Sequence, residues 1–307
     1  MQPLRSVSDL NGHVIGIVMK ELVRRAIGMI RKELGKFETY EKASLTEKKD
    51  WVTSADTHAQ AMYLKLIKEC FPTFGVIAEE VEEEGENHCL IPCTEANLDI
   101  YFTVDPLDGT KAFIRRQSHG IGTMISLVCN GEVIAACVGD IMTKEVYYCR
   151  PGSPHVHRIR SFDHGETLSI DQSLSLQDQY VLLRDAPYLY SKTVQAMIGP
   201  GQNPLVNGLS VEGGSIGICM ARLWKGEVGM LVLKPSNETP WDLCPVAGIS
   251  EKLGFIFVTI NCSHTEYLVP AKPQISKYVE KRDHEVIVLH RSRYSELISW
   301  AMREQTE

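Results

Sequence analysis

The sequence predicts a mixed fold of the α/β or α+β class, in which helices and sheets form layers. Three observations lead to this class. The chain opens with helical hydrophobic patterns, continues with short apolar strands that end in acids, and then alternates apolar runs with turn signals before further helices. No internal repeat and no low-complexity segment interrupts this order. Helices that alternate with both buried and meandering strands favour a layered domain.

Two helices are predicted in the first 70 residues. In residues 14–34 apolar side chains recur every three or four positions with charges between them, which is the pattern of an amphipathic helix. A second helix is expected to start near Ser54 to Asp56 and to end at about Cys70. Asp56 suits a helix cap at that position, and the residues alone leave a cap and a functional role equally open.

Two short apolar strands are predicted next, and both end in acids. Residues 74–78 form the first, followed by Glu79-Glu80, and a solvated acidic loop is expected over residues 81–86. Residues 101–104 form the second, with Asp105 and Asp108 just past its end. Carboxylates placed there are costly to bury unless a positive charge meets them.

Three further apolar runs predict an antiparallel meander. They cover residues 120–128, 133–141 and 145–148 and are separated by turn signals. Asn130-Gly131, between the first two runs, is typical of a tight β-hairpin.

The polar residues 153–179 predict a boundary between two halves, 1–152 and 153–307, packed closely into one catalytic unit. In the second half Gly213-Gly214-Ser215 precedes a predicted helix over residues 216–223. A strand is expected over residues 228–233. Pro240-Trp241-Asp242 then leads into a helix that ends near residue 253.

Composition restricts the class of partner. The 307 residues are 44% hydrophobic and 23% charged, which is ordinary for a soluble globular protein. A net charge of -7 argues against a nucleic-acid or anionic membrane partner. A small anionic substrate is compatible with that charge where local cations offset the acids.

The cysteines and the amino terminus predict a cytoplasmic protein. Nine cysteines are an odd number, and several lie in apolar runs, so reduced core thiols fit better than a disulfide framework. Cys89 and Cys93 have no second pair at zinc-finger spacing. The first residues lack a signal-peptide core, and no apolar run approaches the roughly 20 residues of a membrane helix.

The acids at the strand ends point to a hard metal ion beside an anion site. Carboxylate oxygens without nearby histidine or paired cysteine suit Mg²⁺. Pro106 presets a tight turn, so that Asp105 and Asp108 would converge with the Leu107 carbonyl between them. Gly109-Thr110 would then begin a helix whose N–H groups favour an anion. The alternative is an Asp-Pro turn followed by an Asp cap.

Two other phosphate-handling classes are excluded by spacing. Asp108-Gly109-Thr110 looks like part of the dehalogenase-type phosphatase motif, but the position of its nucleophile is occupied by Pro106. The chain also lacks a glycine-rich loop that ends in Gly-Lys-Ser/Thr, which a P-loop NTPase requires.

Four motifs in order resemble those of the inositol monophosphatase superfamily, the lithium-sensitive, magnesium-dependent phosphatases. The resemblance spans roughly residues 14–253 and implies a layered α-β-α-β-α sandwich of the sugar-phosphatase type. Ala78 replaces the usual glycine of the second motif, and the usual glycine-rich stretch is reduced to Lys252-Leu253-Gly254-Phe255. The motifs are Val52-Thr53-Ser54-Ala55-Asp56, Ala78-Glu79-Glu80, Asp105-Pro106-Leu107-Asp108-Gly109-Thr110 and Trp241-Asp242.

The resemblance implies roles for particular residues. Asp56 and Thr110 would orient or deprotonate the attacking water, with Glu79 also catalytic, and attack would be in line without a phosphoenzyme. The role of Glu80 stays open. Two or three Mg²⁺ ions, or Mn²⁺ in their place, would be held by Glu79, Asp105, the Leu107 carbonyl, Asp108 and Asp242. Substrate would be bound by Asp108, Gly109, Thr110, Lys111, Ser215 and Glu238.

Lys111 is the residue that indicates which phosphate ester is the substrate. Superfamily members with lysine directly after Asp-Gly-Thr resemble 3'(2'),5'-bisphosphate nucleotidases and histidinol-phosphate phosphatases. Arg115 and Arg116 would meet a second phosphate, or are surface charges. We therefore favour adenosine 3',5'-bisphosphate as the substrate, with inositol monophosphate or histidinol phosphate as alternatives. An inactive relative that acts as a scaffold or sensor is the alternative of another class.

The resemblance also implies a homodimer. His119 lies near the expected site, either as a substrate contact or as a plain loop residue.

Overall fold

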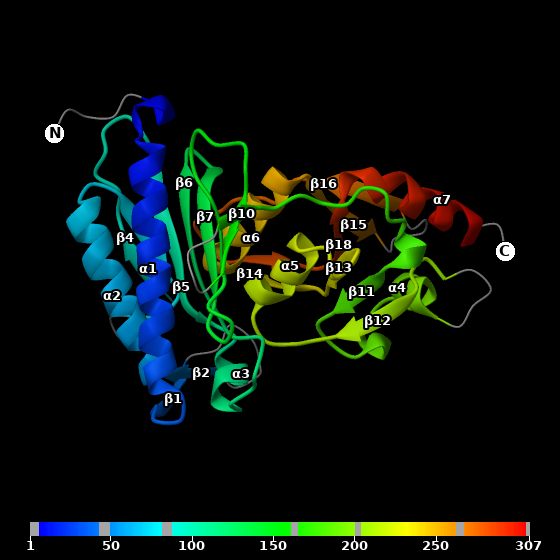
Figure 1. The fold of residues 1–307 in the computed structure, drawn as a ribbon, viewed down its shortest axis with the longest axis horizontal. Coiled ribbons are helices and arrows are strands. Elements are labelled where there is room, and N and C mark those ends of the chain that lie inside the picture. Colours follow the sequence, from blue (N-terminus) through cyan, green and yellow to red (C-terminus); the bar gives the residue numbers. More distant parts are fainter. Residues whose placement is uncertain are drawn as a thin grey trace.

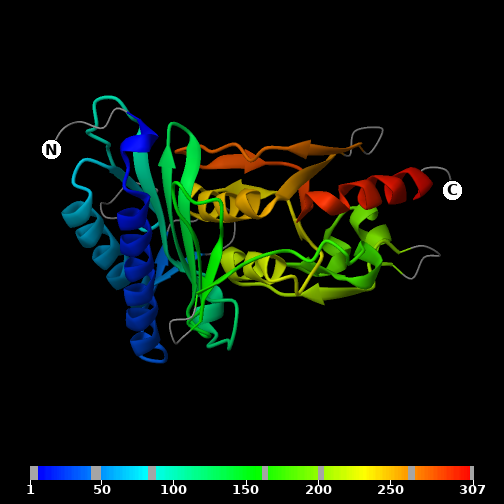
Figure 2. The same ribbon diagram turned by 45° about the horizontal axis from the view of Figure 1, so that its top comes forward.

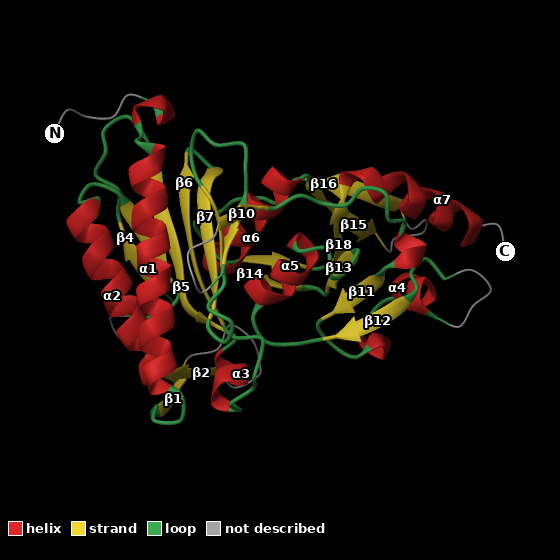
Figure 3. Cartoon of the chain, in the orientation of Figure 1, coloured by secondary structure: helices red, strands yellow, loops and turns green. Residues whose placement is uncertain are grey.

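The protein folds into five layers in the order α-β-α-β-α (Figure 1), which confirms the predicted class and sandwich. The computed structural model describes residues 6–42, 50–81, 88–160, 165–199, 204–261 and 267–304. Figure 3 distinguishes the helical layers from the sheets between them. The helices are α1 (Gly12–Glu33), α2 (Ser54–Cys70), α3 (Thr110–Ile114), α4 (Lys192–Ile198), α5 (Ile216–Trp224), α6 (Pro240–Leu253) and α7 (Tyr294–Glu304).

The first sheet has eight strands in the order β10-β9-β8-β7-β6-β5-β3-β4. Only the β3 and β5 pair is parallel among these described strands. The strands are β3 (Gly75–Ala78), β4 (Cys89–Ile91), β5 (Ile100–Asp108), β6 (Gly122–Cys129), β7 (Glu132–Asp140), β8 (Val146–Cys149), β9 (His157–Ile159) and β10 (Gly165–Thr167).

The second sheet has six strands in the order β12-β11-β13-β18-β15-β16. β11 runs parallel to both of its neighbours, β12 and β13. Its strands are β11 (Tyr180–Leu183), β12 (Gly208–Val211), β13 (Met230–Leu233), β15 (Phe255–Asn261), β16 (Tyr267–Ala271) and β18 (Glu285–His290). Two small sheets pair β1 (Thr39–Lys42) with β2 (Asp50–Thr53), and β14 (Ser236–Glu238) with β17 (Glu280–Arg282).

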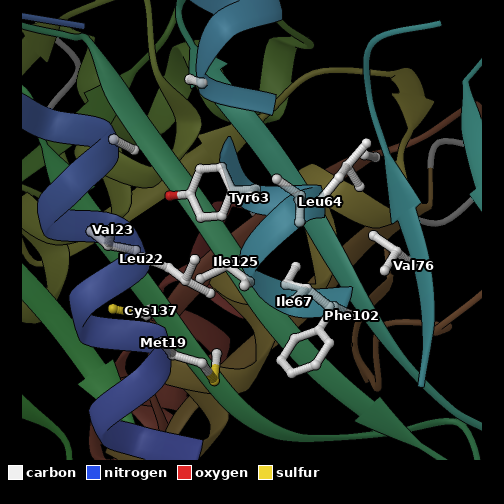
Figure 4. Close-up of a cluster of buried hydrophobic side chains, with 14 of the residues drawn as sticks. Met19, Leu22, Val23, Tyr63, Leu64, Ile67, Val76, Phe102, Ile125 and Cys137 are labelled. Carbon is white, nitrogen blue, oxygen red and sulfur yellow. The ribbon is translucent and has the colours of Figure 1, made fainter. Parts of the chain in front are cut away.

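Apolar faces hold the layers together. α1 and α2 pack on one face of the first sheet, where Met19, Tyr63 and Phe102 belong to one buried cluster (Figure 4). α5 and α6 lie between the two sheets (Figure 2), with Trp224 fully buried in the central core. α4 and α7 cover the far face of the second sheet, where Trp300 is buried. These six helices therefore bury apolar side chains against the sheets.

The helices and the hairpin expected in the first half are confirmed. α1 and α2 match the two predicted helical patterns within two residues, and Asn11 caps α1 by accepting from the N–H groups of His13 and Val14. β6, β7 and β8 form the predicted meander. Asn130 and Gly131 have φ values of 51° and 78°, as a tight hairpin turn requires.

Two elements differ from expectation. β5 does not stop before Asp105; it continues to Asp108, with a register shift against β6 between those two residues. The polar residues 153–179 also contain β9 and β10, which extend the first sheet. The division at 152/153 stays a proposal. The acidic loop expected over residues 81–86 lies almost wholly outside the described residues.

None of the described helices is long and apolar enough to cross a bilayer.

Candidate active site

A bulge at the end of β5 builds the centre of the site. Asp105 pairs with Met124 and Asp108 with Gly122, so β5 uses one residue more than β6 over this stretch. Pro106, which cannot donate a ladder hydrogen bond, lies in the bulge. The Asp105 carboxylate accepts from the Leu107 N–H at 3.0 Å. The bulge places Asp105, Leu107 and Asp108 on one cavity.

Asp242 joins these acids from the first turn of α6. One carboxylate oxygen each from Asp105, Asp108 and Asp242 lies within 4.8 Å of the others, so the three could hold one metal ion. Asp242 also accepts from the Thr239 hydroxyl at 2.8 Å. Acids that are far apart in the chain are therefore gathered in one place, as the sequence predicts; their role as ligands stays a prediction.

Asp108 connects the first sheet to α5. Its carboxylate accepts from the hydroxyl of Ser215, from the N–H of Ile216 at 3.1 Å and from the N–H of Gly217 at 2.8 Å. These donors lower the pKa of Asp108, but burial outweighs them and raises it overall. Asp108 thus accepts hydrogen bonds from N–H groups in the first turn of α5, which have no acceptor within that helix.

Burial and mutual repulsion raise the pKa values of the other acids. Desolvation is the main cause for Asp105, whose pKa lies well above its usual value, and for Asp242, whose pKa rises to about 7. The charges of Glu79 and Asp108 add to both shifts. A cluster of this kind is costly without a cation. Oxygen donors alone, at this spacing and burial, fit a hard divalent ion such as Mg²⁺.

Glu79 lines the same cavity, but its carboxylate faces Lys42. The Lys42 Nζ lies 2.8 Å from Glu79 Oε1 and 2.9 Å from Glu80 Oε1. Burial, followed by the charge of Glu79, raises the pKa of Glu80 to about 8. Gln60 fixes this turn by bonding both the N–H and the carbonyl of Glu80, at 2.9 and 2.7 Å. Glu80 therefore belongs to a hydrogen-bonded triad with Lys42 and Glu79, and of the two acids only Glu79 lines the cavity.

The Asp56 carboxylate makes contacts that fit both roles left open by the sequence, a helix cap and a functional residue. Its Oδ2 accepts from the Thr53 N–H at 2.8 Å, which caps α2. Its Oδ1 accepts from the Thr110 hydroxyl at 3.2 Å, and Leu107 O is a second acceptor for that hydroxyl at 3.1 Å. Burial is the main reason that the pKa of Asp56 rises to about 6. The carboxylate is fully buried, yet it is linked to a threonine that lines the cavity.

Close backbone packing forms the floor beside Thr110. Gly109 has a φ of 92°, and a Cβ there would lie 2.4 Å from the Gly120 carbonyl oxygen. Gly214, with a φ of 91°, meets the same oxygen at 2.5 Å. Only glycine fits at either position. The loop after β5 and the loop before α5 therefore touch through main-chain atoms, and the Ser215 N–H donates to Gly120 at 2.8 Å.

The cavity has a volume of about 690 Å³ and extends from the acids to the second sheet. Its cationic lining residues come from both halves of the chain. They are Lys111, Arg115, Arg184, Lys234 and Arg282. Asp185 and Tyr190 line the wall formed by the second sheet.

Three predicted substrate residues have different surroundings. Lys111 lines the cavity, as do Gly109 and Thr110. Ser215 is fully buried behind Asp108. Glu238 is not among the described residues that line the cavity, and its carboxylate pairs with Arg282 at 2.6 Å. The substrate roles of Ser215 and Glu238 stay predictions.

Of the residues whose roles the sequence left open, only Arg115 lines the cavity. Arg116 and His119 are exposed on the loop that follows α3.

Several residues at the site had no signal in the sequence. Lys42 and Gln60 lie in ordinary polar and helical contexts, and only the fold brings them to Glu79 and Glu80. Arg184 and Lys234 follow short strands of the second sheet, where no motif marks them.

The five layers define a sandwich of the sugar-phosphatase type, and comparison with known proteins identifies the family. The model of the inositol monophosphatase family matches residues 13–297. Because this match covers nearly the whole sequence, the chain belongs to the inositol monophosphatase family. The resemblance of the four ordered motifs is confirmed.

Individual relatives are more distant. Nus factor SuhB of Vibrio cholerae serotype O1 is 32% identical over 133 residues, 42% of this chain and 45% of that protein. A fructose-1,6-bisphosphatase/inositol-1-monophosphatase of Thermotoga maritima is 28% identical over 162 residues, 52% of this chain and 54% of that protein. The aligned region thus spans about half the length of these curated relatives.

Solved structures share the fold over more of the chain. The structure of an IMPase/NADP phosphatase complexed with Mg²⁺ and phosphate has a TM-score of 0.64 and 18% identity, and the match covers 94% of this chain and 95% of that one. At this identity the likeness concerns the fold.

Proposed function

We propose that the protein is a Mg²⁺-dependent phosphomonoesterase that hydrolyses a small phosphorylated metabolite. The observation that carries this proposal is the buried cluster of Asp105, Asp108 and Asp242 at one end of a cavity of about 690 Å³. Membership of the inositol monophosphatase family supports the same chemistry. A binding partner without enzymatic activity would not need Thr110 and Asp56 beside that cluster.

The metal ions would be held by oxygen atoms only, from Glu79, Asp105, the Leu107 carbonyl, Asp108 and Asp242. When bound, Mg²⁺ supplies a Lewis acid that withdraws charge from phosphoryl oxygens and acidifies water. For Glu79 to serve as a ligand, its carboxylate has to share or leave its contact with Lys42. The number of ions, the use of Mn²⁺ and inhibition by Li⁺ belong to this proposal.

Thr110 and Asp56 would position the attacking water and take its proton. Thr110 lines the cavity and its hydroxyl can donate to Asp56 at 3.2 Å, so its oxygen could accept a hydrogen bond from a water in the cavity. A proton passed to Thr110 can continue to Asp56, because burial raises the pKa of that carboxylate to about 6, closer to neutral pH than an ordinary aspartate. Glu79 lies on the same cavity and would act beside this pair.

The amides of Gly109 and Thr110 would bind the phosphate. They lie at the start of α3, where N–H groups have no intrahelical acceptor. With five residues, α3 is too short for a substantial macrodipole, so these amides act through direct hydrogen bonds. Attack by water would be in line and without a phosphoenzyme, as the family resemblance implies.

For the substrate, we favour a 3'(2'),5'-bisphosphate nucleotide such as adenosine 3',5'-bisphosphate. Lys111 and Arg115 add positive charge to the cavity wall, which supports an anionic ligand with more than one phosphate. Inositol monophosphate and histidinol phosphate are the alternatives. The homodimer, the cytoplasmic location and the lack of a nucleic-acid partner stay predictions.

A substrate panel tests this function. The release of inorganic phosphate from adenosine 3',5'-bisphosphate, inositol 1-phosphate and histidinol phosphate is measured with Mg²⁺, with EDTA and with added Li⁺. We expect hydrolysis with Mg²⁺ only, and inhibition by Li⁺. Hydrolysis that persists in EDTA contradicts the metal mechanism. Mg²⁺ binding without hydrolysis of any ester favours the scaffold or sensor alternative.

A further inference from the structure

Two cations stand side by side at one edge of the second sheet. β11 and β13 are parallel neighbours, and Leu183 of β11 pairs with Val232 of β13. Arg184 and Lys234 are the first residues beyond the carboxyl ends of these two strands, and both line the cavity. The carboxyl edge of parallel strands is the usual ligand-binding edge of an open α/β sheet. This edge lines the same cavity as Asp105, Asp108 and Asp242.

The surrounding residues hold both cations in place. Nη2 of Arg184 donates to the carbonyl of Gly214, and the Arg184 main-chain N–H donates to the Tyr190 hydroxyl at 3.0 Å. Nε of Arg184 is buried, and no described residue accepts its proton. Nζ of Lys234 lies 2.8 Å from Asp185 Oδ2 and 5.9 Å from the centre of the Tyr190 ring. The wall is therefore ordered before any ligand arrives.

The positive charge on this wall exceeds its acidic complement. Arg282 is fully engaged, because it pairs with Glu238 and donates to the carbonyls of Lys234 and His284. Among the described lining residues, Asp185 pairs with Lys234, and against the effect of burial the charge of Arg184 lowers the pKa of Asp108. Two cations that line one cavity can together bind a second anionic group on the substrate.

We propose that Arg184 and Lys234 bind a second phosphate group of the substrate, and that Asp185 holds Lys234 in place until that phosphate replaces it. This inference rests on the proposed phosphatase function and deepens it. The substrate class is then a metabolite with two separate phosphates. Inositol monophosphate offers only hydroxyl groups to this wall, and the ammonium group of histidinol phosphate would be repelled there.

Two relatives carry names that fit this class: the Thermotoga protein is called a fructose-1,6-bisphosphatase as well as an inositol-1-monophosphatase, and the IMPase/NADP phosphatase is named for a dinucleotide with several phosphates. For this chain, a nucleoside bisphosphate and a sugar bisphosphate share the same chemistry, and the test includes both.

The test measures kcat and KM of the full chain for three esters: adenosine 3',5'-bisphosphate, fructose 1,6-bisphosphate and inositol 1-phosphate. The variants are Arg184→Gln, Lys234→Gln and Asp185→Asn, and Lys272→Gln, which removes an exposed ion pair to Glu132, is the matched control. Thermal melts check that each variant folds.

For Arg184→Gln and Lys234→Gln we expect kcat/KM for a bisphosphate, divided by that for inositol 1-phosphate, to fall about tenfold or more, mainly through KM. Asp185→Asn should lower KM for the bisphosphate, because it removes the acid that competes for Lys234. Lys272→Gln should leave the ratio unchanged. The bisphosphate with the larger change in ratio identifies the nucleoside or sugar source.

An unchanged ratio in both cation variants overturns this inference, as does an Asp185→Asn variant whose KM rises like that of Lys234→Gln. In either case, hydrolysis of the esters by the wild-type protein leaves the proposed phosphatase function standing. If the wild-type protein hydrolyses none of the esters, the phosphatase function itself fails.

Discussion

Asp56 divides its two oxygens between the start of α2 and a hydroxyl from another element. Oδ2 caps α2 through Thr53, and Oδ1 meets Thr110. The position of Asp56 at a helix start predicts a cap, and the family resemblance implies a catalytic role. Only the tertiary fold, which brings Thr110 to the free oxygen, makes the two roles compatible. Lys42 was not predictable in the same way, since its partners Glu79 and Glu80 lie on another strand end.

Thr110→Val tests the proton path at the residue scale. Valine keeps the shape of threonine and removes the hydroxyl that Asp56 accepts from. We expect kcat to fall by about a hundredfold or more while KM changes little. Thr110→Ser, which keeps a hydroxyl, is the matched control and should retain most of the activity. Steady-state kinetics at saturating Mg²⁺ decide the matter, and near wild-type turnover of the valine variant excludes the hydroxyl from the path.

Asp242→Asn separates metal binding from folding. Asparagine still accepts from the Thr239 hydroxyl but removes one of several buried like charges. The melting temperature in EDTA should therefore stay the same or rise, whereas its increase on addition of Mg²⁺ should be lost, together with most of the activity. Glu251→Gln, on the same helix and half buried away from the cavity, is the control and should keep both. An equal Mg²⁺ response in the two variants would show that Asp242 is no ligand.

At the scale of elements, the strand ends were harder to predict than the helices. The hydrophobic periodicity of α1 and α2 is local, so the sequence alone predicts both helices closely. The continuation of β5 to Asp108 depends on an extra residue accommodated against β6, which is a property of the pair of strands. β9 and β10 are short edge strands in a polar segment, and their pairing is set by the sheet they join.

Ser215→Ala tests the connection between α5 and the acids. Ser215 caps α5 by accepting from the Ile218 N–H at 3.0 Å and also donates to Asp108. We expect a loss of about 1 kcal/mol or more in the free energy of unfolding, together with weaker Mg²⁺ binding, because Asp108 loses a donor that orients it. Urea unfolding and a Mg²⁺ titration followed by melting temperature measure the two effects.

Ser191→Ala is the matched control for that variant. Ser191 caps α4 by accepting from the Val194 N–H at 3.3 Å, far from the acids in the layer order. It should lose stability and keep the Mg²⁺ affinity of the wild type. If the two variants bind Mg²⁺ equally well, Ser215 acts only as a cap.

At the scale of the whole molecule, the cavity lies where both sheets and the central helices contribute. β5 of the first sheet supplies Asp105 and Asp108, α6 supplies Asp242, and the end of β13 supplies Lys234. The ordered motifs predict the family and the set of acids, because those residues are few and local in sequence. The cavity wall that carries Arg184 and Lys234 was not predictable from local patterns, since it arises from the pairing of β11 with β13.

Three buried acids, Asp56, Glu80 and Asp242, should make the free energy of unfolding fall as the pH rises. An ordinary ion-paired carboxylate has the opposite effect. Folding raises the pKa of Asp56 to about 6, of Asp242 to about 7 and of Glu80 to about 8, in each case mainly through burial. Protonation therefore favours the folded state. The contribution of these groups is fully present below about pH 4 and is lost as the pH rises through those values.

In EDTA we therefore expect the melting temperature to fall between about pH 5 and about pH 8. With saturating Mg²⁺ the fall should be smaller, because the cation stabilises ionised Asp242, whereas Asp56 and Glu80 are not proposed ligands. Melting curves at matched ionic strength test this, and the slope in EDTA should be flatter for Asp242→Asn. A melting temperature in EDTA that rises over this pH range would mean that folding does not raise the pKa values of these acids.

The bonds between Asp108 and the start of α5 have a consequence for synthesis on the ribosome. Asp108 leaves the exit tunnel roughly a hundred residues before Ser215, Ile216 and Gly217, at synthesis rates of about 5–20 residues per second. During that interval its carboxylate has none of the donors that it finds in the finished protein. The nascent first sheet cannot complete its catalytic edge until the polypeptide is translated past α5.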